Sequence, residues 1–262
     1  MTTIHPTASV DPSAELGEGV VVGAFTLVEG GVRIGDRTVL ESHVAIKRGV
    51  TYGTDGYVAQ GAVIGGLPQD VKFRGEETEV VIGDRCTVRE YVTIHRASGE
   101  GNATRMGNDC FVMAYSHLAH NVVLHDHVTM ANDVGLSGHV TVEELVTIGG
   151  KTGVHQFARI GRSAMVGGMT RIVKDVPPFM LVEGHDQEVH DINAVGLRRL
   201  GVTSASRMAL HKACKLLYKS QLGLRNAMEI VRRDVALTPE VEYLLAFEER
   251  RQGGRNGRGD QR

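Results

Sequence analysis

A six-residue period runs through the first two-thirds of the chain. Ten dipeptides consist of an apolar residue or Tyr followed by Gly, and all ten lie in one phase of the period. Random placement would put only about one glycine in six in any given phase, so chance is a poor explanation. A short fixed period is typical of a stacked β-solenoid. The ten glycines are Gly17, Gly23, Gly35, Gly53, Gly65, Gly83, Gly107, Gly149, Gly161 and Gly167.

Each hexapeptide is interpreted as one short strand followed by a corner. The aliphatic residue before the glycine points into the core, as in residues 32–36 and 81–84. The glycine is expected to supply the positive φ or the close packing that a corner requires. Three strands make one triangular coil, so residues eighteen apart stack about 4.8 Å above one another. The pattern therefore predicts a mainly β domain that needs no Trp for its core.

The pattern and the charge both change near residue 190. The hexad signal stops after residues 175–178, and helical spacing begins shortly afterwards. Residues 1–190 carry a net charge of −8, whereas residues 191–262 carry +6. We expect a β-solenoid over 1–190, a small helical domain over 191–252, and a disordered tail over 253–262.

Within the helical part, three helices are predicted from capping residues and apolar spacing. Thr203 or Ser204 is the expected N-cap of the first, and Pro239 opens the third. Basic residues crowd the first of these segments. These basic residues form either a solvated helix face or a binding site for an acidic protein or a phosphorylated ligand. The helices are expected over 203–219, 224–235 and 239–251, and the basic residues are Arg198, Arg199, Arg207, Lys212, Lys215 and Lys219.

Two segments, near 67–80 and 96–104, are too polar and irregular to be coils. Loops inserted on one wall of a solenoid usually carry function or mediate assembly.

The composition and the N-terminal sequence limit the class of protein. Three scattered cysteines argue against a disulfide framework, and the N-terminus lacks the basic and apolar regions of a signal peptide. We expect a cytoplasmic protein with no membrane insertion and no nucleic-acid partner.

Histidines are the best candidates for chemistry. His120 and His139 are nineteen residues apart, and His139 and His155 are sixteen apart, so each step is close to one coil. These side chains, with His117, should recur near one edge of the prism. They could be zinc ligands, but no Cys lies nearby and no carboxylate has a ligand-like spacing. General base catalysis is favoured, because a neutral imidazole can take a proton from a hydroxyl.

Seven motifs resemble one family closely, in the same order along nearly the whole chain. The hexad solenoid with a helical C-terminus resembles the UDP-N-acetylglucosamine O-acyltransferases of lipid A biosynthesis. A hexad repeat alone is unspecific, because many acyl- and acetyltransferases share it, whereas the combination of motifs is not. The motifs are PQDVKFRGE (68–76), VTIHR (92–96), SHLAHN (116–121), GH (138–139), GGKTGVHQF (149–157), DVPPF (175–179) and NAVGLRRLG (193–201).

This resemblance implies a left-handed parallel β-helix that assembles as a homotrimer with active sites between subunits. The implied reaction moves a 3-hydroxyacyl chain from acyl carrier protein to the 3-hydroxyl of UDP-N-acetylglucosamine. No cofactor or metal is implied, because the carrier-protein thioester is a co-substrate. The chain also contains no Ser or Cys nucleophile motif, which suits direct transfer.

The resemblance also implies roles for individual residues. His120 matches the general base, and the Gly138 N–H matches the donor to the oxyanion. Gly168 matches the position that limits acyl length, and a missing side chain there would leave room for a longer chain. The matched substrate-binding positions are Asp70, Lys72, His117, His139, His155 and Gln156, with Asn193 and Arg199 near the uridine nucleotide.

Three residues depart from the family pattern. Asn121 follows the base where many relatives carry Asp; it belongs to the predicted site and can orient the imidazole, but cannot stabilise imidazolium by charge. Val195 stands where an acidic residue is frequent, and Leu200 replaces the second of two arginines. These departures leave the acceptor open. The alternatives are acyl or acetyl transfer to another nucleotide sugar, including a 3-amino sugar, and a non-catalytic or metal-binding trimeric solenoid.

Overall fold

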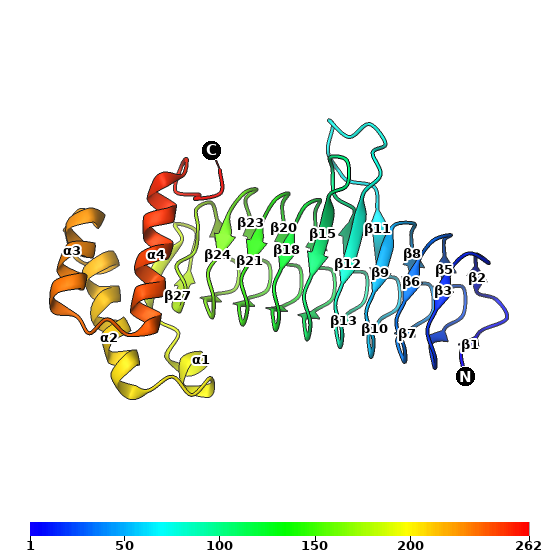
Figure 1. Ribbon diagram of the computed structural model, residues 1–262, viewed down its shortest axis with the longest axis horizontal. Coiled ribbons are helices and arrows are strands. Elements are labelled where there is room, and N and C mark those ends of the chain that lie inside the picture. Colours follow the sequence, from blue (N-terminus) through cyan, green and yellow to red (C-terminus); the bar gives the residue numbers. More distant parts are fainter. Residues whose placement is uncertain (262) are drawn as a thin grey trace.

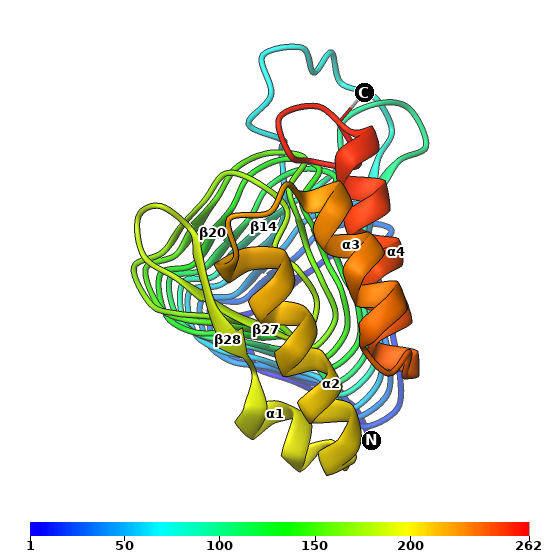
Figure 2. The same ribbon diagram turned by 90° about the vertical axis from the view of Figure 1, so that its left-hand side faces the viewer.

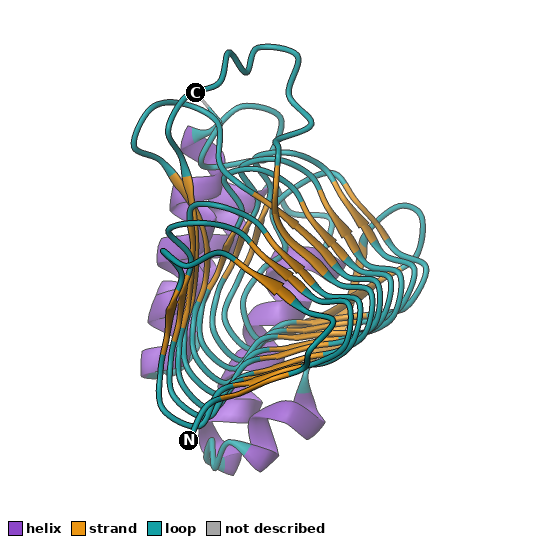
Figure 3. Cartoon of the chain, turned by 90° about the vertical axis from the view of Figure 1, so that its right-hand side faces the viewer, coloured by secondary structure: helices purple, strands orange, loops and turns teal. Residues whose placement is uncertain are grey.

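Each hexapeptide forms a strand of usually two residues, and three strands complete one coil of a left-handed parallel β-helix. The computed structural model describes residues 1–261. Figure 1 shows the solenoid from its N-terminal end to the helices at its other end, and Figure 3 shows its triangular cross-section. The fold class predicted from the hexad period and the family resemblance is confirmed.

The three faces of the prism are three sheets. Sheet A contains β1 (Thr3–Ile4), β4 (Val21–Val22), β7 (Val39–Leu40), β10 (Tyr57–Val58), β13 (Thr87–Val88), β16 (Phe111–Val112), β19 (Thr129–Met130), β22 (Thr147–Ile148), β25 (Met165–Val166), β27 (Met180–Glu183) and β28 (Glu188–Ile192). Sheet B contains β2 (Ser9–Val10), β5 (Leu27–Val28), β8 (Ala45–Ile46), β11 (Val63–Gly66), β14 (Thr93–His95), β17 (His117–Leu118), β20 (Gly135–Leu136), β23 (Gly153–Val154) and β26 (Arg171–Ile172). Sheet C contains β3 (Glu15–Leu16), β6 (Arg33–Ile34), β9 (Val50–Tyr52), β12 (Glu79–Ile82), β15 (Ala103–Met106), β18 (Val123–Leu124), β21 (Thr141–Val142) and β24 (Arg159–Ile160).

The core is a set of aliphatic ladders inside the prism. The second residue of a two-residue strand points inward, and Leu118 pairs in register with Leu136 of the next coil. Both side chains are fully buried, as are Leu40, Ile46 and Ile148. Burying one such side chain contributes about 1.5–3 kcal/mol relative to leaving it exposed. A stack of these ladders explains how a chain without Trp forms a continuous core.

The hexad glycines serve close packing, and only Gly65 (φ +86°) among them has a positive φ. A Cβ atom added at Gly35 would lie 2.6 Å from the carbonyl carbon of Gly53 in the next coil. The positive φ occurs two residues later, at Arg37 (56°) and Asp55 (55°) for example. At a corner, glycine thus occurs where neighbouring coils are in contact. The residue two positions later adopts the left-handed backbone conformation and can be of almost any type.

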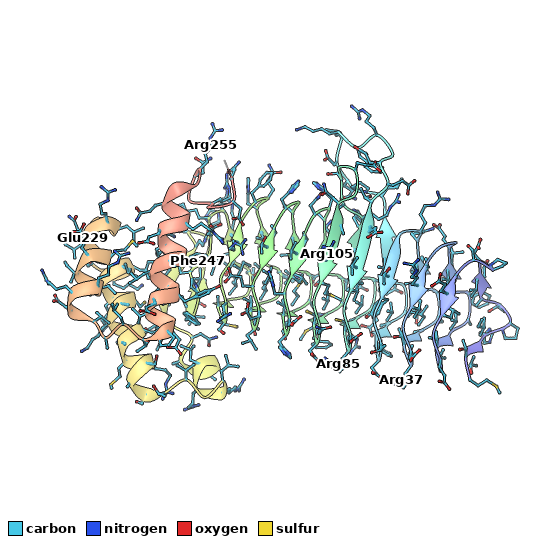
Figure 4. The ribbon with its side chains drawn as sticks, in the orientation of Figure 1. Arg37, Arg85, Arg105, Glu229, Phe247 and Arg255 are labelled. Carbon is cyan, nitrogen blue, oxygen red and sulfur yellow. The ribbon has the colours of Figure 1, made fainter. Side chains whose placement is uncertain are left out.

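The edge between sheets C and A carries stacked ion pairs. Arg37 Nε lies 2.6 Å from Asp55 Oδ1, and Arg85 Nε lies 2.7 Å from Asp109 Oδ1. Figure 4 shows Arg37 and Arg85 along the lower side of the solenoid, with the long loops on its upper side. These pairs are exposed, so each contributes little to stability. They mark this edge as one that faces solvent.

Two loops leave the solenoid on one side (Figure 1). Tyr57 pairs with Thr87, thirty residues later, so the coil between them has twelve extra residues. Thr93 pairs with His117, twenty-four residues later, so that coil has six extra. The extra residues form the two predicted excursions, which lie between sheets B and C. The loops contact each other: the Gly101 N–H donates to the Glu77 carbonyl oxygen at 3.0 Å.

The helical part covers the C-terminal end of the solenoid (Figure 2). Antiparallel pairing of β27 with β28 leads the chain out of the solenoid, which the sequence did not predict. The three predicted helices are confirmed, and Thr203 caps the first through its hydroxyl. The last turn of that helix is π-helical. The elements are α1 (Ala194–Arg199), α2 (Ser204–Cys214), the π-turn η1 (Lys215–Lys219), α3 (Leu224–Asp234) and α4 (Pro239–Gly253).

The end of the chain differs from the expected disordered tail. Gly253 ends α4, and the following residues fold back onto the last coil. The Gly259 N–H donates to Asp175 Oδ2 at 2.8 Å, and Arg159 Nε donates to Asp260 Oδ2 at 3.0 Å. The composition of this segment did not indicate an ordered structure, because the residues that it contacts lie in the solenoid. Across residues 1–261, no helix has the length and apolar character that a membrane span requires.

The glycine packing predicts a stability effect. Gly53→Ala would place a Cβ atom 2.6 Å from the Gly83 carbonyl carbon, which is backbone and cannot rotate away. We expect a loss of about 1–3 kcal/mol in the free energy of unfolding, measured by urea denaturation. Gly223→Ala is the control, because its Cβ atom would meet nothing within 4 Å. Equal stability of the two variants would contradict the packing argument.

Candidate active site

The edge between sheets B and C brings most of the predicted residues together. His120, Gly138 and Gln156 occupy equivalent corners after β17, β20 and β23, one coil apart. A cavity of about 580 Å³ opens beside them along sheet B. It is lined by His117, His120, Gly138, His155 and Gln156, together with Gln69, Ala119, Gly135, Leu136, Ser137, Gly153, Val154, Arg171, Ile172 and Val173.

His120 is held in one orientation by Asn121. The Asn121 amide nitrogen donates to the Ser98 carbonyl oxygen at 3.1 Å, and Oδ1 accepts from the Ser98 N–H at 3.0 Å. This pair of bonds fixes which side of the amide carries the oxygen. Oδ1 lies 2.9 Å from His120 Nδ1, so Nδ1 must carry the hydrogen. The lone pair of Nε2 is left free to accept a proton.

Gly138 is required by the position of the His120 ring. A Cβ atom at Gly138 would lie 2.5 Å from His120 Nε2, so any side chain would displace the imidazole. Within residues 1–261 the Gly138 N–H donates to no protein group, whereas its carbonyl oxygen accepts from the Phe157 N–H at 3.2 Å. A backbone N–H without a protein acceptor can bind a developing oxyanion. The site therefore combines an imidazole nitrogen that can accept a proton with a backbone N–H that is free to donate.

The other histidines of the cluster are kept neutral by burial. Burial lowers the pKa of His95 to about 4, with a smaller effect of the nearby His117 and His120. Burial also lowers the pKa of His117 and of His139. The His95 and His117 rings meet edge to face, and so do those of His120 and His139. At neutral pH these imidazoles can donate or accept hydrogen bonds without carrying charge.

Asp70 and Lys72 lie on the first excursion. The Lys72 N–H donates to Asp70 Oδ1 at 2.9 Å, and this bond is the main reason that the pKa of Asp70 is lowered. Smaller contributions that lower this pKa come from the Ser98 hydroxyl and from His120. The Lys72 side chain is exposed. Gln69, the residue before Asp70, lines the same cavity as His120, so the excursion borders the edge that holds His120.

The predicted nucleotide residues do not lie in this cavity. Asn193 caps α1 by accepting from the Gly196 N–H, and it donates to the Ser163 carbonyl oxygen, both at 3.0 Å. With Arg199 it lines a separate cavity of about 560 Å³ over sheet A. Gly168 lines a third, of about 420 Å³, beside the β27–β28 hairpin. In a single copy of the chain, the predicted site residues therefore lie on different faces of the solenoid.

Sequence reasoning missed Ser98 and the lining residues Gln69, Ser137 and Arg171. Ser98 bonds to both His120 and Asn121, and its only signal was a place within an excursion. Among the described residues 1–261, no three His, Cys, Asp or Glu side chains are grouped as ligands of a metal ion.

Burial of His95 predicts a dependence of stability on pH. Because its pKa falls from 6.5 to about 4 on folding, the unfolded chain binds the proton first. The free energy of unfolding should therefore fall between pH 6.5 and 4, by roughly 1–2 kcal/mol for a ring only partly buried. His95→Asn should make the fall shallower in urea denaturation at several pH values. His185→Asn, at a side chain 80 % exposed, is the control and should leave the fall unchanged.

Comparisons with known proteins agree on one family. The model described as UDP-N-acetylglucosamine O-acyltransferase, domain 2, matches residues 175–258, and the bacterial transferase hexapeptide model matches residues 103–138. The acyl-[acyl-carrier-protein]–UDP-N-acetylglucosamine O-acyltransferase of Thermodesulfovibrio yellowstonii is 41 % identical over 97 % of this chain and 99 % of its own length. The enzyme of that name from Gloeothece citriformis is 47 % identical over 78 % of this chain and 74 % of its own.

Solved structures agree with the sequence relatives. The UDP-N-acetylglucosamine acyltransferase of Bacteroides fragilis has a TM-score of 0.92 and 33 % identity, covering 94 % of this chain and 97 % of its own. The Acinetobacter baumannii structure has a TM-score of 0.88 and 34 % identity, covering 92 % and 95 %. With this level of identity along nearly its whole length, the chain belongs to the UDP-N-acetylglucosamine O-acyltransferase family.

Proposed function

We infer that this protein is an acyltransferase that moves an acyl chain from acyl carrier protein to UDP-N-acetylglucosamine, the first step of lipid A biosynthesis. The relatives carry this activity in their names. The observation that carries the chemistry is the free Nε2 of His120 beside the Gly138 N–H. We place the reaction in the cytoplasm, and we propose that it requires no cofactor, because the carrier-protein thioester is itself a substrate.

The geometry supports direct transfer. His120 Nε2 accepts the proton of the sugar 3-hydroxyl as that oxygen attacks the thioester carbonyl carbon of a 3-hydroxyacyl chain. The negative charge on the carbonyl oxygen is stabilised by the Gly138 N–H. The intermediate then collapses, the carbon–sulfur bond breaks, and the imidazolium returns the proton to the departing sulfur. No acyl-enzyme forms, and holding both substrates in place supplies much of the acceleration.

A homotrimer is supported by the character of the three faces. From β1 to β25, the outward side chains of sheet A include no Asp, Glu, Lys or Arg, as in Val39, Phe111 and Met165. Those of sheet B are also uncharged until Arg171. Sheet C instead presents charged residues such as Arg33. Two uncharged faces that meet at one edge suit three prisms around an axis, with sheet A of one copy against sheet B of the next.

This packing would complete the site. The cavity of Asn193 and Arg199 lies over sheet A, and that of His120 lies along sheet B. Contact between the two faces brings a nucleotide-binding arginine from one copy to the base of another. The guanidinium suits a diphosphate. The exposed side chains of Lys212 and Lys215 on the helical cap suit an acidic carrier protein.

A transfer assay tests the function. Purified protein is given UDP-N-acetylglucosamine and acyl carrier protein thioesters of several lengths, with and without a 3-hydroxyl, and products are read by mass. We expect one hydroxyacyl group on the sugar nucleotide, and His120→Ala should reduce the rate by a factor of about 10²–10⁴. The preferred length tests Gly168, because a bulkier residue there should shorten it.

The control in this assay is His127→Ala, which removes an exposed ring on the edge between sheets C and A, outside the cavity. Unchanged transfer by His120→Ala would contradict the assignment of the base. Val195 lines the nucleotide cavity without offering a charge. Other nucleotide sugars, including a 3-amino sugar, are therefore screened as acceptors, and preference for one of them would reassign the substrate.

A complementation experiment tests the shared site. Arg199→Ala and His120→Ala should each be inactive as pure proteins. In mixed trimers, some interfaces combine an intact His120 with an intact Arg199 from the neighbouring copy. We expect co-expression to restore up to about a third of the wild-type rate for a threefold assembly. No recovery in verified mixed trimers would show that both residues act from the same copy.

A further inference from the structure

The cavity beside His120 has an open floor on sheet B between two walls. The first residues of β17, β20, β23 and β26 pair in register on successive coils. All four of these residues line the cavity, and in order they are His117, Gly135, Gly153 and Arg171. Side chains therefore stand at both ends of this row, and none stands between them.

The packing of the coils does not require the two glycines in the row. A Cβ atom added at Gly135 or Gly153 would meet nothing within 4 Å, and neither residue has a positive φ. Across residues 1–261, no other strand begins with glycine. Glycine weakens a strand and often marks a place where a ligand approaches closely. The open floor therefore serves the cavity and not the stability of the solenoid.

The wall at the N-terminal end of the row is the His117 ring, which is held in place. Its Nδ1 atom lies 2.7 Å from Thr93 Oγ1, and the ring meets that of His95 edge to face at a centroid distance of 4.7 Å. These rings block the floor on this side. A chain attached to the reacting carbonyl at His120 must therefore run the other way, toward β26.

The wall at the C-terminal end is the side chain of Arg171, which is exposed. No Asp or Glu lines the cavity to pair with it, and the residues that follow it in the lining, Ile172 and Val173, are apolar. An arginine in such a place lays its methylene stem along apolar surface and keeps the guanidinium in water. The stem can therefore close the end of an apolar groove.

We propose that Arg171 is a specificity-determining residue that closes the groove for the acyl chain and so limits its length. The chain lies over Gly135 and Gly153, and its methyl end meets the stem of Arg171. In the proposed trimer, the uncharged sheet A of a neighbouring copy covers this floor. Gly168, which the resemblance assigns to acyl length, lines a different cavity, so the wall at Arg171 is a separate determinant.

The spacing of the coils converts this wall into a number of carbons. Neighbouring strands lie about 4.8 Å apart, so Arg171 is two steps, or about 10 Å, from the coil of Gly138. An extended chain with bonds of about 1.5 Å advances about 1.25 Å per carbon. One coil thus corresponds to about four carbons, and the floor holds about eight beyond the carbonyl.

The test measures kcat/KM of the full-length enzyme for carrier-protein thioesters of graded length. Arg171→Ala removes the wall, so the preferred 3-hydroxyacyl chain should lengthen by about four carbons, with kcat/KM for that chain rising about tenfold to a hundredfold. Gly153→Leu brings a wall one coil closer to Gly138, so the preferred chain should shorten by about four carbons. The control is Arg105→Ala, at an exposed arginine of sheet C that does not line the cavity (Figure 4).

The competing interpretation is that the Arg171 guanidinium binds a phosphate of one of the substrates. Arg171→Met separates the two, because it keeps a long stem and removes the charge. We expect this variant to retain the wild-type chain length. A preferred length that stays unmoved in Arg171→Ala, with a higher KM for UDP-N-acetylglucosamine in both variants, would overturn the proposal.

The inference rests on the proposed acyl transfer, so a binding measurement separates their failures. Isothermal titration uses 3-hydroxyacyl pantetheine thioesters of graded length, which carry no charge that could pair with Arg171, and no acceptor sugar. Affinity should rise with length up to a limit, and the limit should move by about four carbons in Arg171→Ala. A moved limit in a protein that transfers no acyl chain would refute the reaction and support the wall. Active transfer with an unmoved limit would do the reverse.

Discussion

Parallel hydrogen bonding between successive coils is the interaction on which the rest of the structure depends. The ladder sets a repeat of eighteen residues, and the same bonds reach into the site. The His139 N–H donates to the His120 carbonyl oxygen at 3.1 Å, and the Phe157 N–H donates to that of Gly138 at 3.2 Å. The proposed base and the proposed oxyanion donor are therefore one coil apart, because the register of the ladder fixes their separation. The geometry of the proposed site thus follows from the fold.

Much of this architecture could be predicted from the sequence, because its period is a direct consequence of the coil. The inward ladders and the helices after Thr203 and Pro239 follow from local spacing. The backbone conformation at the corners could not be predicted in the same way. Residues such as Arg37 and Asp55 have a positive φ although nothing in their type requires it. There, the stacked coils impose a conformation against local preference.

The site was predictable where it follows the period and unpredictable where it does not. The spacing of His120, His139 and His155, close to one coil each, predicted a shared edge, and the family resemblance added Gly138 and Gln156, which lie one and two coils after His120. Ser98 lies in an insertion that has no period, and its role depends on how that loop folds back onto Asn121. The contacts of residues 254–261 with the last coil are of the same kind. Such non-local contacts carry no sequence signal.

The solenoid and the excursion loops contribute differently to the site. Gly138 cannot accept a side chain, and His120 cannot leave its corner, because both are fixed by neighbouring coils. The excursion loops pack on each other and on the edge through a small number of hydrogen bonds. Substitutions in the loops can therefore change the surroundings of His120 without disturbing its position. A neutral Asn121 is tolerable in such a scaffold, because its amide oxygen still orients the His120 ring.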